Sequence, residues 1–180
     1  MGEVELAFRW LRGRVIAITG TKGKSTTTTL VGRMLTADGR QVLVGGNIGV
    51  PLSAQVDQST PDTLHVVETS SFQLETTTTF HPWIAVWLNF ADDHLDRHPS
   101  IDAYAAAKAR IVEHQVAGDW TVVNADDPVV MERTARSAGT RVPFSLEGRI
   151  DEGCVVDGQW IVRRTATSVE RLVPLSSVEL

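Results

Sequence analysis

Residues 20–26, with the sequence GTKGKST, form a glycine-rich segment whose residue types suit phosphate binding. Gly20 and Gly23 allow the backbone to turn so tightly that successive N–H groups converge on one anion. Lys24 would reach the β- and γ-phosphates of a nucleotide, and the Ser25 hydroxyl would ligate Mg²⁺. The segment therefore predicts a site for ATP with Mg²⁺.

One position departs from the full phosphate-loop pattern, which has a glycine where this chain has Ile18. The alternative interpretation is a glycine-rich turn in which Gly-Lys-Ser occurs by chance. The flanking segments favour a phosphate site, because residues 15–18 have the continuous apolar run of a buried strand and residues 25–37 have the pattern of a helix. Such a helix would direct its positive end at the phosphates. The predicted ATP contacts are Gly20, Thr21, Lys22, Gly23, Lys24, Ser25, Thr26 and Thr27.

A carboxylate follows another predicted strand. Glu68 comes directly after the strand predicted for residues 63–67. In open α/β sheets, ligands bind at the carboxyl ends of the strands, so Glu68 would face the phosphate site. Its oxygens are the hard ligands that Mg²⁺ prefers. The alternative role is an acidic cap for the segment that follows.

Lys108 lies in the middle of an apolar stripe on the helix predicted for residues 101–115. The stripe consists of Ile101, Tyr104, Ala105, Lys108, Ile111 and Val112. A buried ammonium group is costly, so Lys108 either extends its charge to solvent or serves a site. Periodicity alone leaves both possibilities open.

His94 lies among three carboxylates within residues 92–96, after a predicted buried strand. A histidine in this setting can be a metal ligand or a phosphate contact. A solvated turn would have the same composition. The residues by themselves favour the turn.

Alternating strands and helices must position these side chains. Strands are predicted at residues 15–18, 41–44, 63–67, 83–88 and 120–123, and helices at residues 4–11, 25–37, 101–115 and 128–137. This alternation predicts an α/β fold with a doubly wound, mainly parallel sheet. Residues 155–162 predict a small C-terminal β-hairpin region around Asp157-Gly158, and residues 171–175 could add a strand.

Composition excludes several classes of protein. The net charge of −5 argues against a nucleic-acid partner, because nucleic-acid binders carry a basic face. No apolar run reaches the length of a membrane span, so no membrane insertion is expected. Cys154 is the only cysteine, which rules out an intrachain disulfide and fits a reducing compartment. We therefore expect a cytoplasmic protein.

Several sequence strings together resemble one enzyme family. Residues 19–27 are similar to the phosphate loop of the Mur ligases and the related folylpolyglutamate synthases, in which the first glycine is commonly absent. Residues 45–49 (GGNIG), 68–75 (ETSSFQLE), 89–98 and 106–108 resemble the branch that adds D-glutamate. The resemblance runs in register from about residue 2 to about residue 127. The order and spacing of the strings make it specific.

The resemblance implies an ATP-dependent amide ligase of peptidoglycan precursor synthesis. ATP would phosphorylate the alanine carboxylate of UDP-N-acetylmuramoyl-L-alanine, and the amine of D-glutamate would attack the acyl phosphate. Carried over by position, Lys24 binds the γ-phosphate, and Ser25 and Glu68 hold one Mg²⁺. His94 and a carbamylated Lys108 hold a second Mg²⁺, so Lys24, His94 and Lys108 are the implied catalytic residues. The implied substrate contacts are Asn47, Ser70 and Gln73.

Two positions depart from the pattern of relatives. Ala91 stands where threonine is frequent, and Lys22 stands where asparagine is frequent. Neither change removes a predicted metal ligand.

The family also implies a division into domains. Residues 1–13 would be the connector from an N-terminal UDP-binding domain, and residues 14–180 would be the central ATP-binding domain, shortened at its C-terminal end. The full enzyme would be a monomer, and this portion alone would be inactive because the domains for UDP and D-glutamate are missing. The alternatives are another Mur-type ligase, a folylpolyglutamate synthase relative, or a stand-alone nucleotide-binding module without catalysis.

Overall fold

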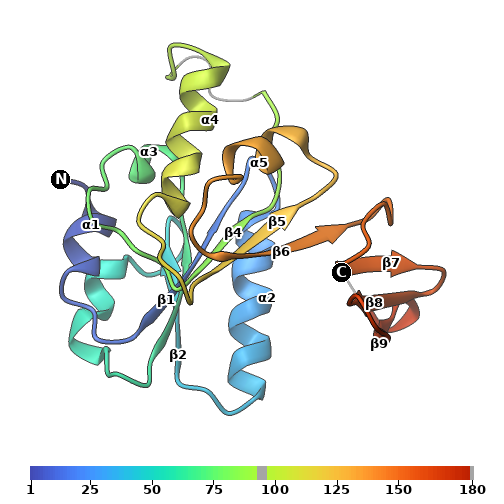
Figure 1. The fold of residues 1–180 in the computed structure, drawn as a ribbon. Coiled ribbons are helices and arrows are strands. Elements are labelled where there is room, and N and C mark those ends of the chain that lie inside the picture. The colour runs from blue at the N-terminus through green and yellow to red at the C-terminus, as the bar shows by residue number, and fades with distance from the viewer. Residues whose placement is uncertain (93–96, 179–180) are drawn as a thin grey trace.

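A mainly parallel β-sheet forms the centre of the molecule in the computed structural model, which describes residues 1–92 and 97–178 (Figure 1). The strand order is β2-β3-β1-β4-β5-β6-β7-β8-β9. Pairing is parallel from β2 through β7 and antiparallel from β7 to β9. The strands are β1 (Arg14–Thr19), β2 (Val42–Gly46), β3 (Leu64–Glu68), β4 (Ile84–Trp87), β5 (Trp120–Asn124), β6 (Thr140–Ser145), β7 (Gly153–Asp157), β8 (Trp160–Arg164) and β9 (Val169–Pro174). The predicted α/β fold with a mainly parallel sheet is thereby confirmed.

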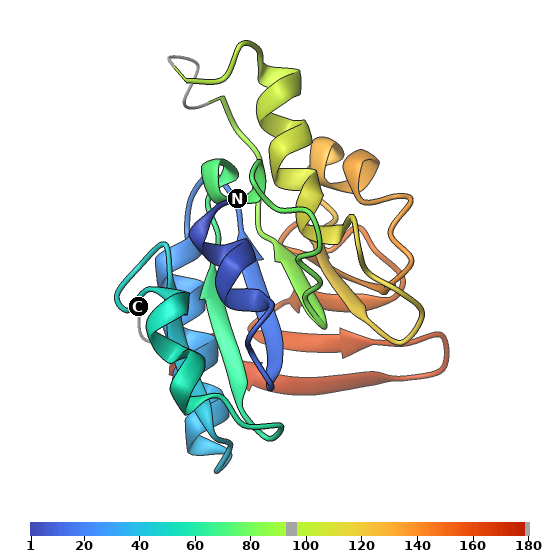
Figure 2. The same ribbon diagram turned by 90° about the vertical axis from the view of Figure 1, so that its left-hand side faces the viewer.

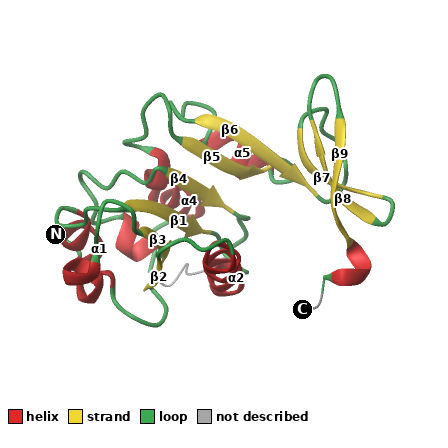
Figure 3. Cartoon of the chain, turned by 90° about the horizontal axis from the view of Figure 1, so that it is seen from below, coloured by secondary structure: helices red, strands yellow, loops and turns green. Residues whose placement is uncertain are grey.

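The connections between consecutive strands from β1 to β6 contain helices, whereas a loop without a helix joins β6 to β7. The α-helices are α1 (Glu3–Phe8), α2 (Lys24–Ala37), α3 (Ser71–Leu74), α4 (Ile101–Ala109) and α5 (Pro128–Arg133), and the 3₁₀ helices are η1 (Leu52–Gln58), η2 (Arg110–Val112) and η3 (Leu175–Ser177). Figure 3 shows α1 and α2 on opposite sides of the sheet. Figure 2 shows the molecule from the side of α1, and β7, β8 and β9 lie at the other end of the sheet. None of the helices in the described residues has the length and apolar character to cross a bilayer.

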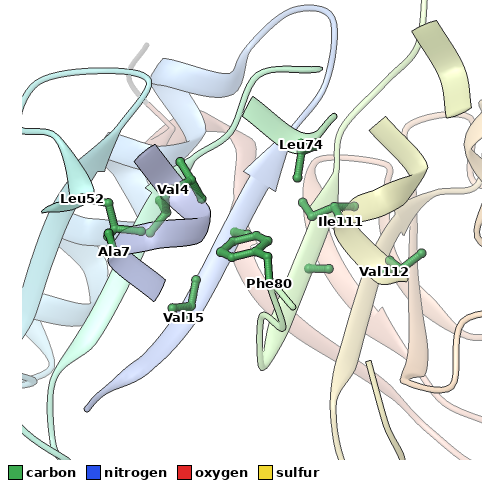
Figure 4. Packing of buried hydrophobic residues seen from close by; sticks show 11 residues of the cluster. Val4, Ala7, Val15, Leu52, Leu74, Phe80, Ile111 and Val112 are labelled. Carbon is green, nitrogen blue, oxygen red and sulfur yellow. The ribbon is translucent and has the colours of Figure 1, made fainter. Parts of the chain in front are cut away.

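Each face of the sheet has its own apolar core. One cluster joins α1, η1, α3 and η2 to the sheet through Val4, Leu52, Leu74 and Ile111, all at most 1% exposed (Figure 4). On the opposite face, Val31 and Leu35 of α2 pack against Ile16, Ile18, Val66 and Val86. Alternate residues of β1 thus enter different clusters, which explains why the strand reads as one continuous apolar run.

Several predicted elements have different bounds in the structure. The helix predicted for residues 101–115 ends as an α-helix at Ala109 and continues as a 3₁₀ turn. The helix predicted for residues 128–137 ends at Arg133. The structure adds β6, η1 and α3, which the sequence pattern did not predict. β6 escaped prediction because Pro143 lies within it and its residues are only partly buried.

His65 on β3 is fully buried and links the sheet to η1. Its Nε2 atom lies 2.8 Å from Ser59 Oγ, and its Nδ1 atom lies 3.0 Å from Gln55 Oε1. Burial disfavours the charged imidazolium and lowers the pKa of His65 to about 4. The ring is therefore neutral in the folded protein near neutral pH.

We expect this histidine to make the fold sensitive to mild acid. In the unfolded chain the pKa of His65 returns to about 6.5, so below that pH the unfolded state binds a proton that the folded state excludes. The free energy of unfolding should fall by about 2 kcal/mol between pH 7 and pH 5 through this group. Urea unfolding at both pH values measures the effect. His65→Gln should remove that part of the slope, and an unchanged slope in the variant would contradict the assignment.

Candidate nucleotide-binding site

The glycine loop, residues 20–26, connects the end of β1 to the start of α2. Gly23 has φ +81° at the N-cap of α2, a left-handed conformation that glycine adopts without steric cost. The first N–H groups of a helix have no partner inside the helix, and the helix dipole makes this end positive. Lys22, Gly23, Ser25 and Thr26 are exposed, so an anion in solution can reach these groups.

Asn89, just after β4, holds the apex of the glycine loop. Its Oδ1 accepts hydrogen bonds from the backbone N–H of Thr21 at 3.0 Å and of Lys22 at 2.9 Å. Its Nδ2 donates to the carbonyl of Lys22 at 3.0 Å. The sequence contains no local signal for this role, because the partners are 67 and 68 positions apart. The amide side chain fixes the first half of the loop and leaves the helix end for a ligand.

Replacing Asn89 by alanine should loosen the loop and weaken nucleotide binding. Three hydrogen bonds are lost, and their combined contribution predicts a loss of affinity of about tenfold, with or without Mg²⁺. Asn124→Ala is the matched control, since Asn124 follows the same pattern at the end of β5 but bonds to Leu88 and Asp126. Fluorescence titration with a labelled nucleotide measures both. Equal affinities for Asn89→Ala and the wild type would show that the hydrogen bonds of the Asn89 side chain do not contribute to nucleotide binding.

The side chain of Lys24 folds back over the loop, where its Nζ donates to the carbonyl of Thr21 at 3.1 Å. This places the ammonium group at the glycine loop itself. The hydrogen bond is to a neutral carbonyl, which a phosphate oxygen would outcompete because charge-assisted bonds are roughly twice as strong.

Glu68 ends β3 next to β1, where its backbone pairs with Ile18. The carboxylate is only 2% exposed, and it accepts hydrogen bonds from Ser25 Oγ at 2.7 Å and from Asn47 Nδ2 at 2.8 Å. A hydroxyl and a carboxylate at a helix N-terminus are a hard-oxygen donor set, which suits Mg²⁺ beside a nucleotide phosphate. The structure thus brings together the two residues predicted to hold the first metal ion.

Lys108 is buried at 2% exposure, as its place in the apolar stripe predicts. Its Nζ donates to the carbonyl of Gly20 at 2.8 Å and lies 4.7 Å from the centroid of the Tyr104 ring. The ammonium group therefore points to the glycine loop and does not extend to solvent. Ile101, the first residue of the stripe, is 41% exposed.

His94, the predicted partner of Lys108 in holding a second metal ion, lies outside the described residues. The structure therefore gives the position of Lys108 alone, at the glycine loop. Across residues 1–92 and 97–178, no group of three histidine, cysteine, aspartate or glutamate side chains is arranged to hold a metal ion. The second metal ion therefore remains a prediction.

Ser70 and Gln73 contact each other at the start of α3. Ser70 Oγ accepts from the Gln73 N–H at 3.3 Å, and Gln73 Oε1 accepts from the Ser70 N–H at 3.1 Å, which is a reciprocal capping box. Both side chains are partly exposed. The cap explains why a helix begins three residues after the end of β3. The roles of Ser70 and Gln73 as substrate contacts remain a prediction.

His98 is a buried polar residue that the sequence did not single out. Its Nε2 lies 3.0 Å from Ser71 Oγ, and its Nδ1 lies 3.0 Å from Glu75 Oε1, away from the line of a hydrogen bond. Serine, histidine and carboxylate in this order also occur in hydrolases. Ser71 is buried as the first residue of α3, so its contact with His98 lies inside the packing of the fold. The group joins α3 to the segment before α4.

A cavity of about 470 Å³ lies between α4 and α5, and Arg110, Glu113 and Arg133 are among its lining residues. It includes no residue of the glycine loop. Arg110 and Arg133 are paired with Glu113 and Asp102. This cavity is therefore not part of the nucleotide site, which is identified by the residue types of the glycine loop on an open surface.

Comparisons with known proteins agree with one another. The family model described as "Mur ligase middle domain" matches residues 18–168. UDP-N-acetylmuramoylalanine–D-glutamate ligase of Pelotomaculum thermopropionicum is 47% identical over 161 residues, which cover 89% of this chain and 35% of that protein. The ligase of the same name from Acidobacterium capsulatum is 47% identical over 182 residues, which cover 100% of this chain and 40% of that protein.

Solved structures share the fold. The MurF ligase from Thermotoga maritima in complex with ADP superposes with a TM-score of 0.65 at 22% identity, over 89% of this chain and 40% of that one. The chain spans 34–40% of the length of the curated relatives it matches.

Proposed function

Because this chain belongs to the Mur ligase middle-domain family, we propose that it is the ATP- and Mg²⁺-binding part of a ligase that joins D-glutamate to UDP-N-acetylmuramoyl-L-alanine. The observation that carries the proposal is the 2.7 Å hydrogen bond from Ser25 to the buried Glu68 at the head of α2. It joins a metal-binding carboxylate to the glycine loop. Relatives that are 46–48% identical to this chain carry the name UDP-N-acetylmuramoylalanine–D-glutamate ligase, which supports the choice of substrates.

The residues of the site have distinct tasks in this reaction. The N–H groups at the start of α2 and the ammonium group of Lys24 would neutralise the phosphates of ATP. Ser25 and Glu68 would hold Mg²⁺, which would supply positive charge beside the transferred phosphoryl group. The acceptor carboxylate displaces ADP and becomes an acyl phosphate. The neutral amine of D-glutamate then attacks the carbonyl carbon of the acyl phosphate, the C–O bond to phosphate breaks, and an amide forms as the nitrogen loses a proton to the departing phosphate. No protein nucleophile is required, so positioning and charge neutralisation are the main contributions.

Lys108 has a separate proposed task. Its Nζ lies 2.8 Å from the Gly20 carbonyl, so a carbamate formed there from CO₂ would replace a cation beside the loop with an anionic oxygen ligand. With His94, which lies outside the described residues, this ligand would hold a second Mg²⁺. The burial of Lys108 supports the proposal, because burying an ammonium group on an apolar face costs free energy and a role in the site would explain why a lysine is found there.

We assign the parts of the chain in the same way. Residues 1–13 are proposed to be the connector from a UDP-binding domain, and residues 14–180 to be part of the central domain of a monomeric enzyme. This chain spans less than half of the length of each relative, which supports the proposal that it is part of a longer enzyme. By itself the chain should bind MgATP but should not form the amide, because contacts to UDP and to D-glutamate would lie elsewhere.

The test is phosphate release by the full-length natural protein. With ATP and UDP-N-acetylmuramoyl-L-alanine, release should require D-glutamate and should not be supported by L-lysine or diaminopimelate. The 180-residue chain under the same conditions should release no phosphate. Equal release with the other amino acids would overturn the choice of substrate, and D-glutamate-dependent release by the 180 residues alone would overturn the assignment of domains.

A further inference from the structure

The loop after β2, residues 45–50, is built closely around Glu68. The backbone N–H of Asn47 donates to the carbonyl of Glu68 at 2.9 Å, and the N–H of Gly46 donates to the carbonyl of Val50 at 3.0 Å. Gly46 has φ +101°, and a Cβ at this position would lie 2.4 Å from the Glu68 carbonyl oxygen. Only glycine permits this approach, so the loop is held against the end of β3 by its backbone.

The side chain of Asn47 makes a second contact with Glu68. Its Nδ2 donates to Oε1 at 2.8 Å, while Ser25 Oγ donates to Oε2 at 2.7 Å. Each carboxylate oxygen has two lone pairs, so two hydrogen bonds fix the plane of the carboxylate and leave lone pairs for a cation. Within residues 1–92 and 97–178, Ser25 and Asn47 are the side chains that donate hydrogen bonds to the Glu68 carboxylate.

We propose that Asn47 is a positioning residue for Mg²⁺, which acts by orienting the Glu68 carboxylate toward the metal ion. This inference rests on the proposed function, and it assigns Asn47 a task beyond the substrate contact that the sequence resemblance implies. Groups that hydrogen-bond a ligating carboxylate set its orientation, and their loss typically lowers metal affinity 10–100-fold.

Asn47 can also link the metal ion to the acceptor. Its side chain is exposed, and within residues 1–92 and 97–178 no donor bonds to its Oδ1 atom. One amide group can thus donate to the metal-binding carboxylate and accept an N–H from a substrate. A substrate bound in this way would lie beside the metal ion, where its carboxylate meets the γ-phosphate.

The fold does not depend on this side chain. The bonds that hold the loop come from backbone atoms of residues 45–50, and truncation of an exposed side chain opens no cavity. Asn47→Ala and Asn47→Leu should therefore fold normally and separate the positioning role from a structural one. Leucine keeps the bulk of the side chain and removes only its hydrogen bonds.

The experiment compares nucleotide binding of the 180-residue protein with and without metal. Affinity for ADP and ATP is measured in EDTA and then across a titration with MgCl₂, and Mn²⁺ binding to the nucleotide complex is followed by electron paramagnetic resonance. In both Asn47 variants the metal-free affinity should stay within about twofold of wild type, whereas the metal midpoint should rise about tenfold or more. Asn89→Ala is the control, since it should weaken metal-free binding and leave the metal midpoint unchanged.

The outcomes separate this inference from the proposed function. If the wild type binds MgATP and the Asn47 variants keep its metal midpoint, the positioning role is wrong and the proposed function stands. If the variants lose metal-free affinity as strongly as Asn89→Ala does, Asn47 acts on the loop and the inference also fails. If the wild-type protein shows no metal-dependent binding, the proposed function fails, and the inference fails with it.

Discussion

Lys24→Ala is expected to reduce the affinity of the protein for MgATP by about 100-fold or more. The ammonium group lies at the glycine loop, where it donates to the neutral carbonyl of Thr21, and it is positioned to bind phosphate oxygens. A hydrogen bond between charged groups contributes about 1.5–3 kcal/mol, and the lost charge would also leave the phosphates less well neutralised. Isothermal titration calorimetry with ATP and Mg²⁺ measures the change.

Lys22→Ala is the matched control for charge. Lys22 lies in the same loop with an exposed side chain, and its contacts to Asn89 come from backbone atoms that the substitution preserves. We expect a change of about threefold or less, as for an exposed charge in high dielectric. If the two alanine variants lose affinity equally, net charge and not the position of Lys24 governs binding, and the assignment of the phosphate site is wrong.

Glu5→Ala is expected to lower the free energy of unfolding by about 3–5 kcal/mol, because it leaves several buried donors without an acceptor. The carboxylate is 0% exposed and accepts hydrogen bonds from the backbone N–H of Thr78, Thr79 and Phe80. The hydroxyls of Thr78 and Thr79 and the Arg9 guanidinium also donate to it. Burial alone raises the pKa of Glu5, but these hydrogen bonds, led by that of the Thr79 hydroxyl, outweigh it and hold the pKa well below its usual range.

Urea unfolding of Glu5→Ala and of Glu3→Ala tests this prediction. Glu3 lies on the same helix and makes one hydrogen bond, to the N–H of Ser53, so its loss should cost about 1 kcal/mol. A cost below about 1 kcal/mol for Glu5→Ala would mean that α1 is not anchored through this carboxylate. The anchor matters for the proposed function, since residues 1–13 would connect the nucleotide domain to the rest of the enzyme.

The sequence predicted the parts of the fold that depend on local pattern. β1, β3 and β4 are runs of apolar residues with few turn formers, and α2 has a glycine on each side of it, so these elements are found within a few residues of their predicted bounds. The helix from Ile101 was predicted too long because apolar periodicity continues through η2, although the backbone there changes to a 3₁₀ turn. Apolar periodicity shows which side chains face the core. It does not show whether each N–H bonds to the carbonyl three or four residues earlier, which is the difference between a 3₁₀ turn and an α-helix.

The site was predictable to a similar extent. The phosphate-loop residues and Glu68 have local signals, namely a motif and a carboxylate at the end of a strand. Lys108 was marked by a charge on an apolar stripe, and its burial bears out that placement. Asn89 and the bond between Asn47 and Glu68 were not predictable, because they join residues far apart in the chain. Such contacts follow only from the order of the strands, in which β2 lies next to β3 and β1 lies next to β4.

The most direct test of the central claim is calorimetric titration of the 180-residue protein with ATP, in EDTA and in Mg²⁺. The geometry of Ser25 and Glu68 at the glycine loop predicts one site per chain whose affinity for ATP rises when Mg²⁺ is added. Glu68→Gln should keep metal-free binding and lose most of that rise. Absence of ATP binding, or a Mg²⁺ effect that persists undiminished in Glu68→Gln, would contradict the claim that this chain holds ATP with Mg²⁺.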